Sequence, residues 1–257
     1  MKTTYITSLL LASVNIALGS PMPRVEARSV ETVLYKRGEV LNERDLDLAA
    51  RHGVDASEMF RHSLVKRSDG NDITIWVHNS FNETLNFHKG GAEEASTSVN
   101  KRAQRVNVPG NFFYTGHWWQ SRSDACGHSS FRSLTSATVG AYTGGVEEMS
   151  RWGHRTRGGF ELHFQIASTN PLLVVAGSNN GANAGFYATR NDKPHMERMV
   201  GTYDIGDLAK DSLRFAKSFS PNGQGVRTAA TGDMTCNANN SGKAGVTWTI
   251  RSVNHRA

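Results

Sequence analysis

Hydrophobic and polar residues alternate with a period of two along much of the chain after residue 68, and this pattern predicts β-strands. The alternation is clearest at residues 73–78, 160–166 and 246–250. Residues 171–176 instead form a continuous apolar run, which is typical of a strand buried on both faces. We therefore expect several short strands joined by turns rich in Gly and Asn.

Further strands are expected at residues 84–87 and 106–108, the second of which leads into a Pro109-Gly110 turn. Only residues 204–218 have helical periodicity, with Asp204 as the expected N-cap. Many short strands with few helices predict a mainly all-β protein. Its expected form is a β-sandwich with one short helix in the C-terminal part.

The first residues have the pattern of a secretory leader. Met1-Lys2 gives a positive start, residues 6–18 are mostly apolar, and Ala17-Leu18-Gly19 fits the A-x-A-like cleavage pattern. The apolar run is shorter than the roughly 20 residues that a membrane-spanning helix needs. We expect a signal peptide over residues 1–19 and a secreted, extracellular product without a transmembrane segment.

Residues 20–67 differ in composition from the rest, being rich in Glu, Arg, Asp, Leu and Ala, and they end at the dibasic pair Lys66-Arg67. Residues 42–64 have a modest amphipathic pattern, and on its own this segment is expected to be frayed or disordered. We interpret it as a propeptide removed by a kexin-like, dibasic-specific protease, which resembles the fungal secretory route. The mature domain would then be residues 68–257. Two other dibasic pairs occur, Lys36-Arg37 and Lys101-Arg102.

Charge and cysteine content narrow the class of protein. The whole chain has a net charge of +6. Residues 68–257 alone hold 19 Lys and Arg against 15 Asp and Glu, so their net charge is only +4. This mild excess argues against nucleic acid as the partner. In an oxidising compartment Cys126 and Cys236 are expected to form a disulfide, with two free thiols as the alternative.

Two groups of side chains are candidates for ligand binding. Arg151, Arg155 and Arg157, with His154, concentrate positive charge around Trp152, as a site for anionic phosphates does. A solvated loop between strands is the alternative. The second group, Trp118-Trp119, presents indole rings of the kind that favour bilayer interfaces and stack on sugars. A partly buried turn is its alternative.

A catalytic interpretation is also possible. His154, Glu161 and His163, near the arginines, provide the acid, base and phosphate clamps that RNA cleavage requires. The solvated face of any strand carries similar residues, however. No metal site is predicted, because the histidines do not have the spacing of metal ligands. No cofactor is predicted either. Asn82 and Asn239 begin N-glycosylation sequences, and both are expected in surface turns.

Several short motifs occur between residue 73 and residue 189. They are IWVHNS at residues 75–80, Pro109-Gly110, SRSD at 121–124, RWGHRT at 151–156, and VVAG at 174–177 followed by NNGA at 179–182. Through these motifs the region resembles the aegerolysin family of small β-sandwich proteins. The resemblance implies binding to membrane sphingolipids and, with a partner protein, pore formation. The chain departs from the family in its pro-segment, its basic charge, its cysteine positions and about 70 further residues.

Together these observations predict a secreted, matured toxin or host-directed effector that binds a target membrane lipid or cell-surface glycan without enzymatic activity. The residues expected to make the contacts are Trp118, Trp119, Trp152, Arg151, Arg155 and Arg157. The alternatives are a secreted ribonuclease-like toxin and a cell-wall glycan-binding protein.

Overall fold

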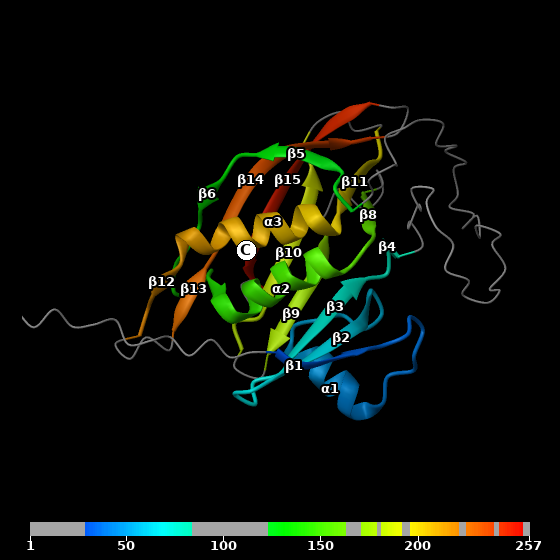
Figure 1. Ribbon diagram of the computed structural model, residues 1–257, viewed down its shortest axis with the longest axis vertical. Coiled ribbons are helices and arrows are strands. Elements are labelled where there is room, and N and C mark those ends of the chain that lie inside the picture. Colours follow the sequence, from blue (N-terminus) through cyan, green and yellow to red (C-terminus); the bar gives the residue numbers. More distant parts are fainter. Residues whose placement is uncertain are drawn as a thin grey trace, which may run out of the picture.

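The computed structural model describes residues 29–83, 123–162, 171–178, 181–191, 196–220, 225–238 and 242–253. Their largest element is an antiparallel sheet of nine strands in the order β1-β2-β3-β9-β10-β15-β14-β5, with β6 also pairing with β14 (Figure 1). The strands are β1 (Ser29–Leu34), β2 (Met59–Arg67), β3 (Ile73–His78), β5 (Cys126–Ser129), β6 (Arg132–Ser133), β9 (Leu172–Ser178), β10 (Ala184–Arg190), β14 (Ala230–Asn237) and β15 (Lys243–Ser252).

Two smaller antiparallel sheets of three strands flank the main one. Their strands are β4 (Phe81–Asn82), β8 (Gly159–Leu162) and β11 (Arg198–Gly201) in the first, and β7 (Ala141–Tyr142), β12 (Lys217–Ser218) and β13 (Val226–Thr228) in the second. The prediction of a mainly β structure is therefore confirmed.

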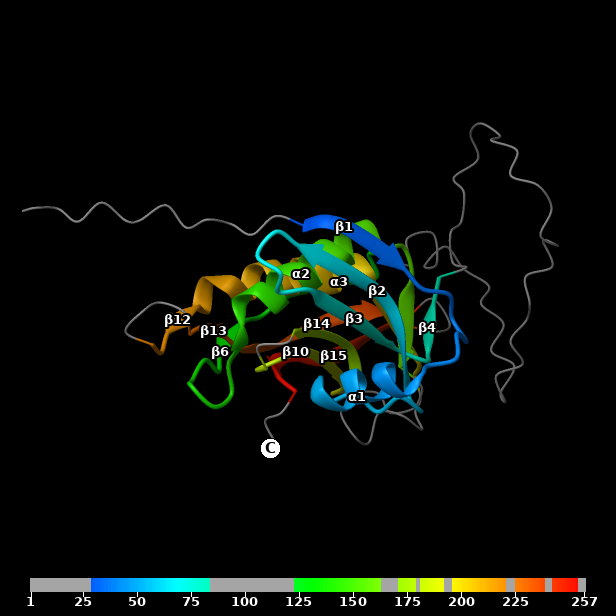
Figure 2. The same ribbon diagram turned by 90° about the horizontal axis from the view of Figure 1, so that it is seen from below.

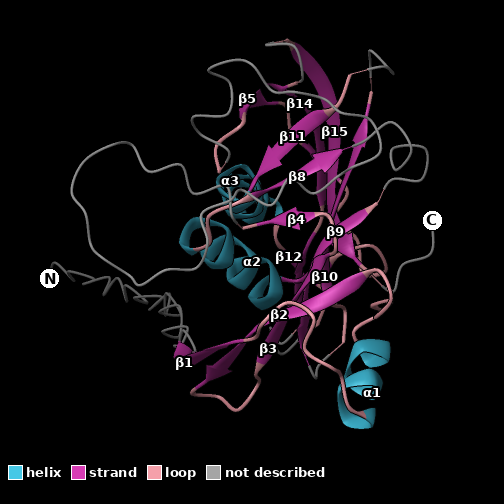
Figure 3. Ribbon diagram, turned by 90° about the vertical axis from the view of Figure 1, so that its right-hand side faces the viewer, coloured by secondary structure: helices cyan, strands magenta, loops and turns pink. Residues whose placement is uncertain are grey.

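The helix content differs from the prediction. In place of the single helix expected, the described residues form α1 (Glu43–Arg51), α2 (Thr143–Arg155) and α3 (Thr202–Ser212), with a 3-10 turn at Leu213–Phe215. Helices α2 and α3 lie side by side on one face of the main sheet, whereas α1 lies on the other (Figures 2 and 3). In the described part of the chain, α2, α3 and the small sheet of β4, β8 and β11 share the apolar core on one face of the main sheet.

The two faces of the sheet have separate apolar cores. On β3, Ile73, Ile75 and Val77 contribute to the cluster that contains the buried side chains of α2 and α3. Trp76 points the other way and packs with Val175 and with residues of and after α1. Because side chains alternate along a strand, full burial of β3 requires a cover on both faces. The apolar run at residues 171–176 falls in β9, which is buried along nearly its whole length, as predicted.

Helix α2 was not predicted from the sequence, because it contains three glycines, which are poor helix formers. A Cβ at Gly153 would lie 2.5 Å from the carbonyl oxygen of Thr202 and 2.7 Å from the Cα of Gly206. The backbones of α2 and α3 therefore approach so closely that only glycine fits at this contact. Ser150 Oγ adds a hydrogen bond of 2.8 Å to the carbonyl oxygen of Gly206.

Helix α3 begins earlier than predicted. Gly201 is the N-cap, and Asp204 occupies the third helical position, where its carboxylate accepts the Gly201 N–H at 2.8 Å. The same carboxylate accepts the backbone N–H groups of Ala125 at 2.9 Å and Cys126 at 3.1 Å. Asp204 is thus buried and connects the start of α3 to β5.

Residues 29–67 are an integral part of the main sheet in the intact chain. Helix α1 ends where Gly53 adopts a φ of +70°, and the Val54 N–H bonds back to the Ala49 carbonyl. Strand β2 then pairs with β3 from Met59 to Val65. The amphipathic stretch expected over residues 42–64 is therefore a helix, a turn and a strand. Removal of this segment would uncover the edge of β3 and the α1-facing side of the sheet.

Candidate functional site

The predicted basic patch lies at the C-terminal end of α2 and in the loop that follows this helix. Val146, Met149 and Trp152 form a buried apolar stripe on this helix, whereas His154 and Arg155 in its last turn are exposed. Arg151 is half-buried and is neutralised within the helix: its guanidinium lies 3.0 Å from Glu148 and 3.9 Å from Glu147.

His154 is exposed and pairs with the neighbouring helix. Its Nε2 lies 2.9 Å from Oδ1 of Asp207 on α3. The histidine is therefore oriented by a carboxylate, and its positive charge, when it is protonated, is compensated. Glu161 is half-buried in β8, opposite Met199 of β11, whereas His163 lies outside the described residues. Of the three predicted catalytic residues, His154 is the one whose contact with a carboxylate is described here.

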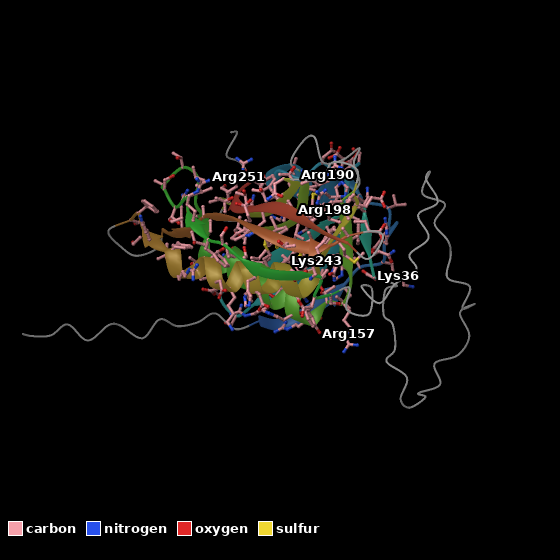
Figure 4. All side chains as sticks on the ribbon, turned by 90° about the horizontal axis from the view of Figure 1, so that it is seen from above. Lys36, Arg157, Arg190, Arg198, Lys243 and Arg251 are labelled. Carbon is pink, nitrogen blue, oxygen red and sulfur yellow. A yellow bond between two sulfur atoms is a disulfide. The ribbon has the colours of Figure 1, made fainter. Side chains whose placement is uncertain are left out.

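Arg155 and Arg157 are the remaining basic residues of the patch. Both are exposed, and neither forms an ion pair in the part of the chain that the structure describes. Figure 4 shows the Arg157 side chain pointing outward from the molecule. These two guanidiniums are therefore accessible to an external anion without breaking an internal salt bridge.

Trp152, predicted as an apolar contact for a ligand, is a core residue with 4% exposure. Its indole Nε1 donates a hydrogen bond of 3.3 Å to Nδ1 of His62, and its ring lies 5.9 Å from that of Phe81. The side chain therefore stabilises the contact between α2 and β2. Trp118 and Trp119 lie outside the described residues.

His62 and Glu83 were not singled out from the sequence, yet they extend the polar contact of Trp152. His62 is buried, and its Nε2 lies 3.3 Å from Oε1 of Glu83. Because Nδ1 accepts from Trp152, the proton of neutral His62 lies on Nε2 and points at Glu83. The hydrogen bond from His62 lowers the pKa of Glu83. Nothing local in the sequence connects residues 62, 83 and 152.

The predicted disulfide is confirmed, since Cys126 of β5 is bonded to Cys236 of β14 across paired strands. Asn82 lies half-buried in β4, paired with Gly159 of β8, rather than in the predicted turn. Asn239 lies outside the described residues. The dibasic pair Lys66-Arg67 forms the end of β2.

No helix within the described ranges combines the length and apolar composition that crossing a bilayer requires. Among the same residues, no group of three or more His, Cys, Asp or Glu side chains is arranged to hold a metal ion.

Comparison of the chain with models of protein families and with curated proteins found no match. The resemblance to the aegerolysin family therefore stays a prediction.

Proposed function

We propose that this chain is a secreted, proteolytically matured protein that binds anionic lipid headgroups on a target cell. It acts there without enzymatic activity, as a toxin or host-directed effector. The observation that supports this proposal is that the guanidiniums of Arg155 and Arg157 are exposed and have no ion-pair partner among the described residues. Basic residues close to an anionic bilayer contribute about 1 kcal/mol each to binding, and salt screens this attraction.

The burial of Trp152 changes the expected form of the contact. Because this indole lies in the core of the intact chain, we assign the electrostatic attraction to Arg155 and Arg157 and any aromatic insertion to Trp118 and Trp119. We therefore expect binding that depends strongly on ionic strength. Neutral cell-wall glycans would gain nothing from the arginines, so the glycan-binding alternative predicts binding that salt leaves unchanged.

Co-sedimentation with lipid vesicles tests the proposal. The processed protein is mixed with vesicles of phosphatidylcholine alone, or with added phosphatidylserine or sphingomyelin. Replacing both arginines, Arg155→Glu with Arg157→Glu, is expected to weaken binding to the anionic vesicles about tenfold or more. Arg132→Glu is the matched control, because Arg132 is equally exposed but lies on β6. Wild-type binding by the double variant, or no binding to any vesicle, contradicts the proposal.

A ribonuclease-like toxin is the second candidate, and the 2.9 Å pair between His154 and Asp207 favours it. A carboxylate that orients an exposed imidazole prepares it for proton transfer. Incubation of the processed protein with RNA, alongside His154→Ala and His163→Ala variants, decides the question. RNA cleavage that both substitutions leave unchanged would remove this site from consideration.

A further inference from the structure

The two dibasic pairs in the described part of the chain occupy very different environments. Lys66-Arg67 lies within the main sheet, where Glu31 and Ser29 of β1 pair with Lys66 and Arg67. The Lys66 ammonium lies 2.8 Å from the Glu31 carboxylate. The Arg67 side chain is only 10% exposed and pairs with Asp69, and its backbone N–H bonds to Asp72.

Lys36-Arg37 lies in the connection between β1 and α1, and residues 36–40 are all exposed. Figure 4 shows Lys36 at the margin of the molecule. The Arg37 guanidinium bonds to the carbonyl oxygens of Phe81 and Asn79, contacts that an acidic protease subsite can replace. A Cβ added at Gly38 would meet no atom of the described residues within 4 Å, so this position is sterically open.

A protease reads a dibasic pair from an extended backbone, so the segment must leave any sheet it belongs to. Exposed loops are accordingly the preferred sites of cutting, and a shielded bond is cut only through an opened state. From these differences we propose that processing is ordered. A dibasic-specific endoprotease cuts after Arg37 first, and the bond after Arg67 becomes accessible only when β1 has left.

The first cut is an ordinary hydrolysis that releases β1. It breaks the amide bond between Arg37 and Gly38. Water adds its oxygen to the carbonyl carbon of Arg37, which becomes a carboxylate, and a proton to the nitrogen of Gly38, which becomes an amine. Strand β1 then remains attached along the sheet edge through its pairing with β2, and the Tyr35 ring and the Arg37 guanidinium add contacts at the end of the released piece. Its apolar side chains contribute little to this attachment, because Leu34 is 71% exposed and Val33 only half-buried. Its departure frees the backbone of Lys66 and Arg67 at the new edge of the sheet.

Limited proteolysis of the oxidised full chain tests the order, with products identified by intact mass. Every sample contains Arg102→Ala, so that the third dibasic pair cannot be cut. We expect a product that begins at Gly38 to accumulate before one that begins at Ser68. Arg37→Ala should slow cutting after Arg67 about tenfold or more, whereas Arg67→Ala should leave cutting after Arg37 unchanged.

A rescue variant separates shielding by β1 from other causes. Glu31→Lys places like charges opposite each other on β1 and β2, which weakens their pairing. Added to Arg37→Ala, it should restore much of the cutting after Arg67. Unslowed cutting after Arg67 in Arg37→Ala, or no rescue by Glu31→Lys, overturns the proposed order. This inference rests on the maturation step of the proposed function, and the vesicle experiment fails or succeeds independently of it.

Discussion

The indole nitrogen of Trp76 donates a hydrogen bond of 2.9 Å to Nδ1 of His52. Trp76 belongs to β3, whereas His52 caps the C-terminus of α1, so this bond fastens the helix to the sheet. A Cβ at Gly177 of β9 would lie 2.2 Å from the imidazole, which shows how tightly the ring packs against the strand. Asn183 adds a second polar contact, donating to the Arg51 carbonyl at 3.1 Å.

This hydrogen bond requires neutral His52. Burial, together with the neighbouring Arg51 charge, lowers the pKa of His52 to about 4. Between pH 6.5 and 4 the unfolded chain binds a proton that the folded chain excludes, so His52 makes the folded state less stable as the pH falls. The loss reaches up to about 3 kcal/mol below pH 4.

We therefore predict that His52→Gln, which keeps an acceptor for Trp76 but does not titrate, reduces the loss of stability in acid. Urea unfolding at several pH values between 7 and about 4 measures the effect. The difference in the free energy of unfolding between the wild type and the variant should become smaller as the pH falls. His128→Gln, at an exposed site, is the control. An equal acid sensitivity of wild type and His52→Gln would show that His52 stays uncoupled from folding.

Asp204 has the opposite dependence on pH. Burial raises the pKa of Asp204 to about 7, although three backbone N–H groups counteract the shift. The folded chain therefore holds a proton that the unfolded chain has lost. The resulting stability is complete below pH 3.8 and is lost as the pH rises through 7.

The substitution Asp204→Asn should remove this downward trend and destabilise the protein by about 1 kcal/mol, since the Cys126 N–H loses its acceptor. Thermal unfolding from pH 4.5 to about 7.5 measures both effects. Asp211→Asn, on the exposed face of α3, provides the comparison. The contrary result would be a stability that rises with pH more steeply in the wild type than in Asp204→Asn. It would show that the three N–H donors outweigh the effect of burial and that the carboxylate is charged throughout this pH range.

The disulfide between Cys126 and Cys236 is expected to contribute substantially to stability, because 110 residues separate the two cysteines. Replacing both with Ala should lower the free energy of unfolding by about 2–5 kcal/mol. Denaturant titration gives this value directly. A reducing agent should destabilise the wild type by a similar amount and leave the double variant unchanged. A reductant effect on the double variant would point to a cause other than this bond.

The contact between α2 and α3 predicts opposite effects at two glycines of the same helix. Gly153→Ala should destabilise the protein by about 1–3 kcal/mol, because the new Cβ would overlap the α3 backbone at Thr202 and Gly206. At Gly144 the nearest atom to an added Cβ is the Arg67 guanidinium, 4.0 Å away. Gly144→Ala should therefore be neutral or stabilising by up to about 1 kcal/mol. Equal losses at both positions would contradict the close-packing explanation.

Sequence periodicity predicted those strands whose own residues alternate regularly between apolar and polar. On β15, Val246, Trp248 and Ile250 alternate with less buried residues because only one face of that strand meets the helical layer. The disulfide followed from an isolated cysteine pair in a secreted chain. Both inferences depend on residues close in sequence or on composition alone.

The candidate site was predicted in part. Positive charge after α2 was visible in the sequence, and Arg155 and Arg157 are indeed exposed. The neutralisation of Arg151 by Glu147 and Glu148 was not predicted, because it requires this segment to be a helix. The partner of His154 was not visible either, because Asp207 lies 53 residues away on another helix. Trp152 was predicted to contact a ligand at the surface. It is a core residue because His62 of β2 packs against it and accepts its indole hydrogen bond.

The sequence by itself determined the β-rich class, the strand positions of the most regular segments and the cysteine pairing. Only the tertiary structure decided that residues 29–67 contribute two strands to the main sheet and a helix that packs on it. It likewise decided that the glycine-containing segment at residues 143–155 is helix α2. The reason is physical. A charged segment with few apolar residues folds only against surfaces supplied from elsewhere, and glycines that weaken an isolated helix permit the close approach that stabilises it in the folded chain.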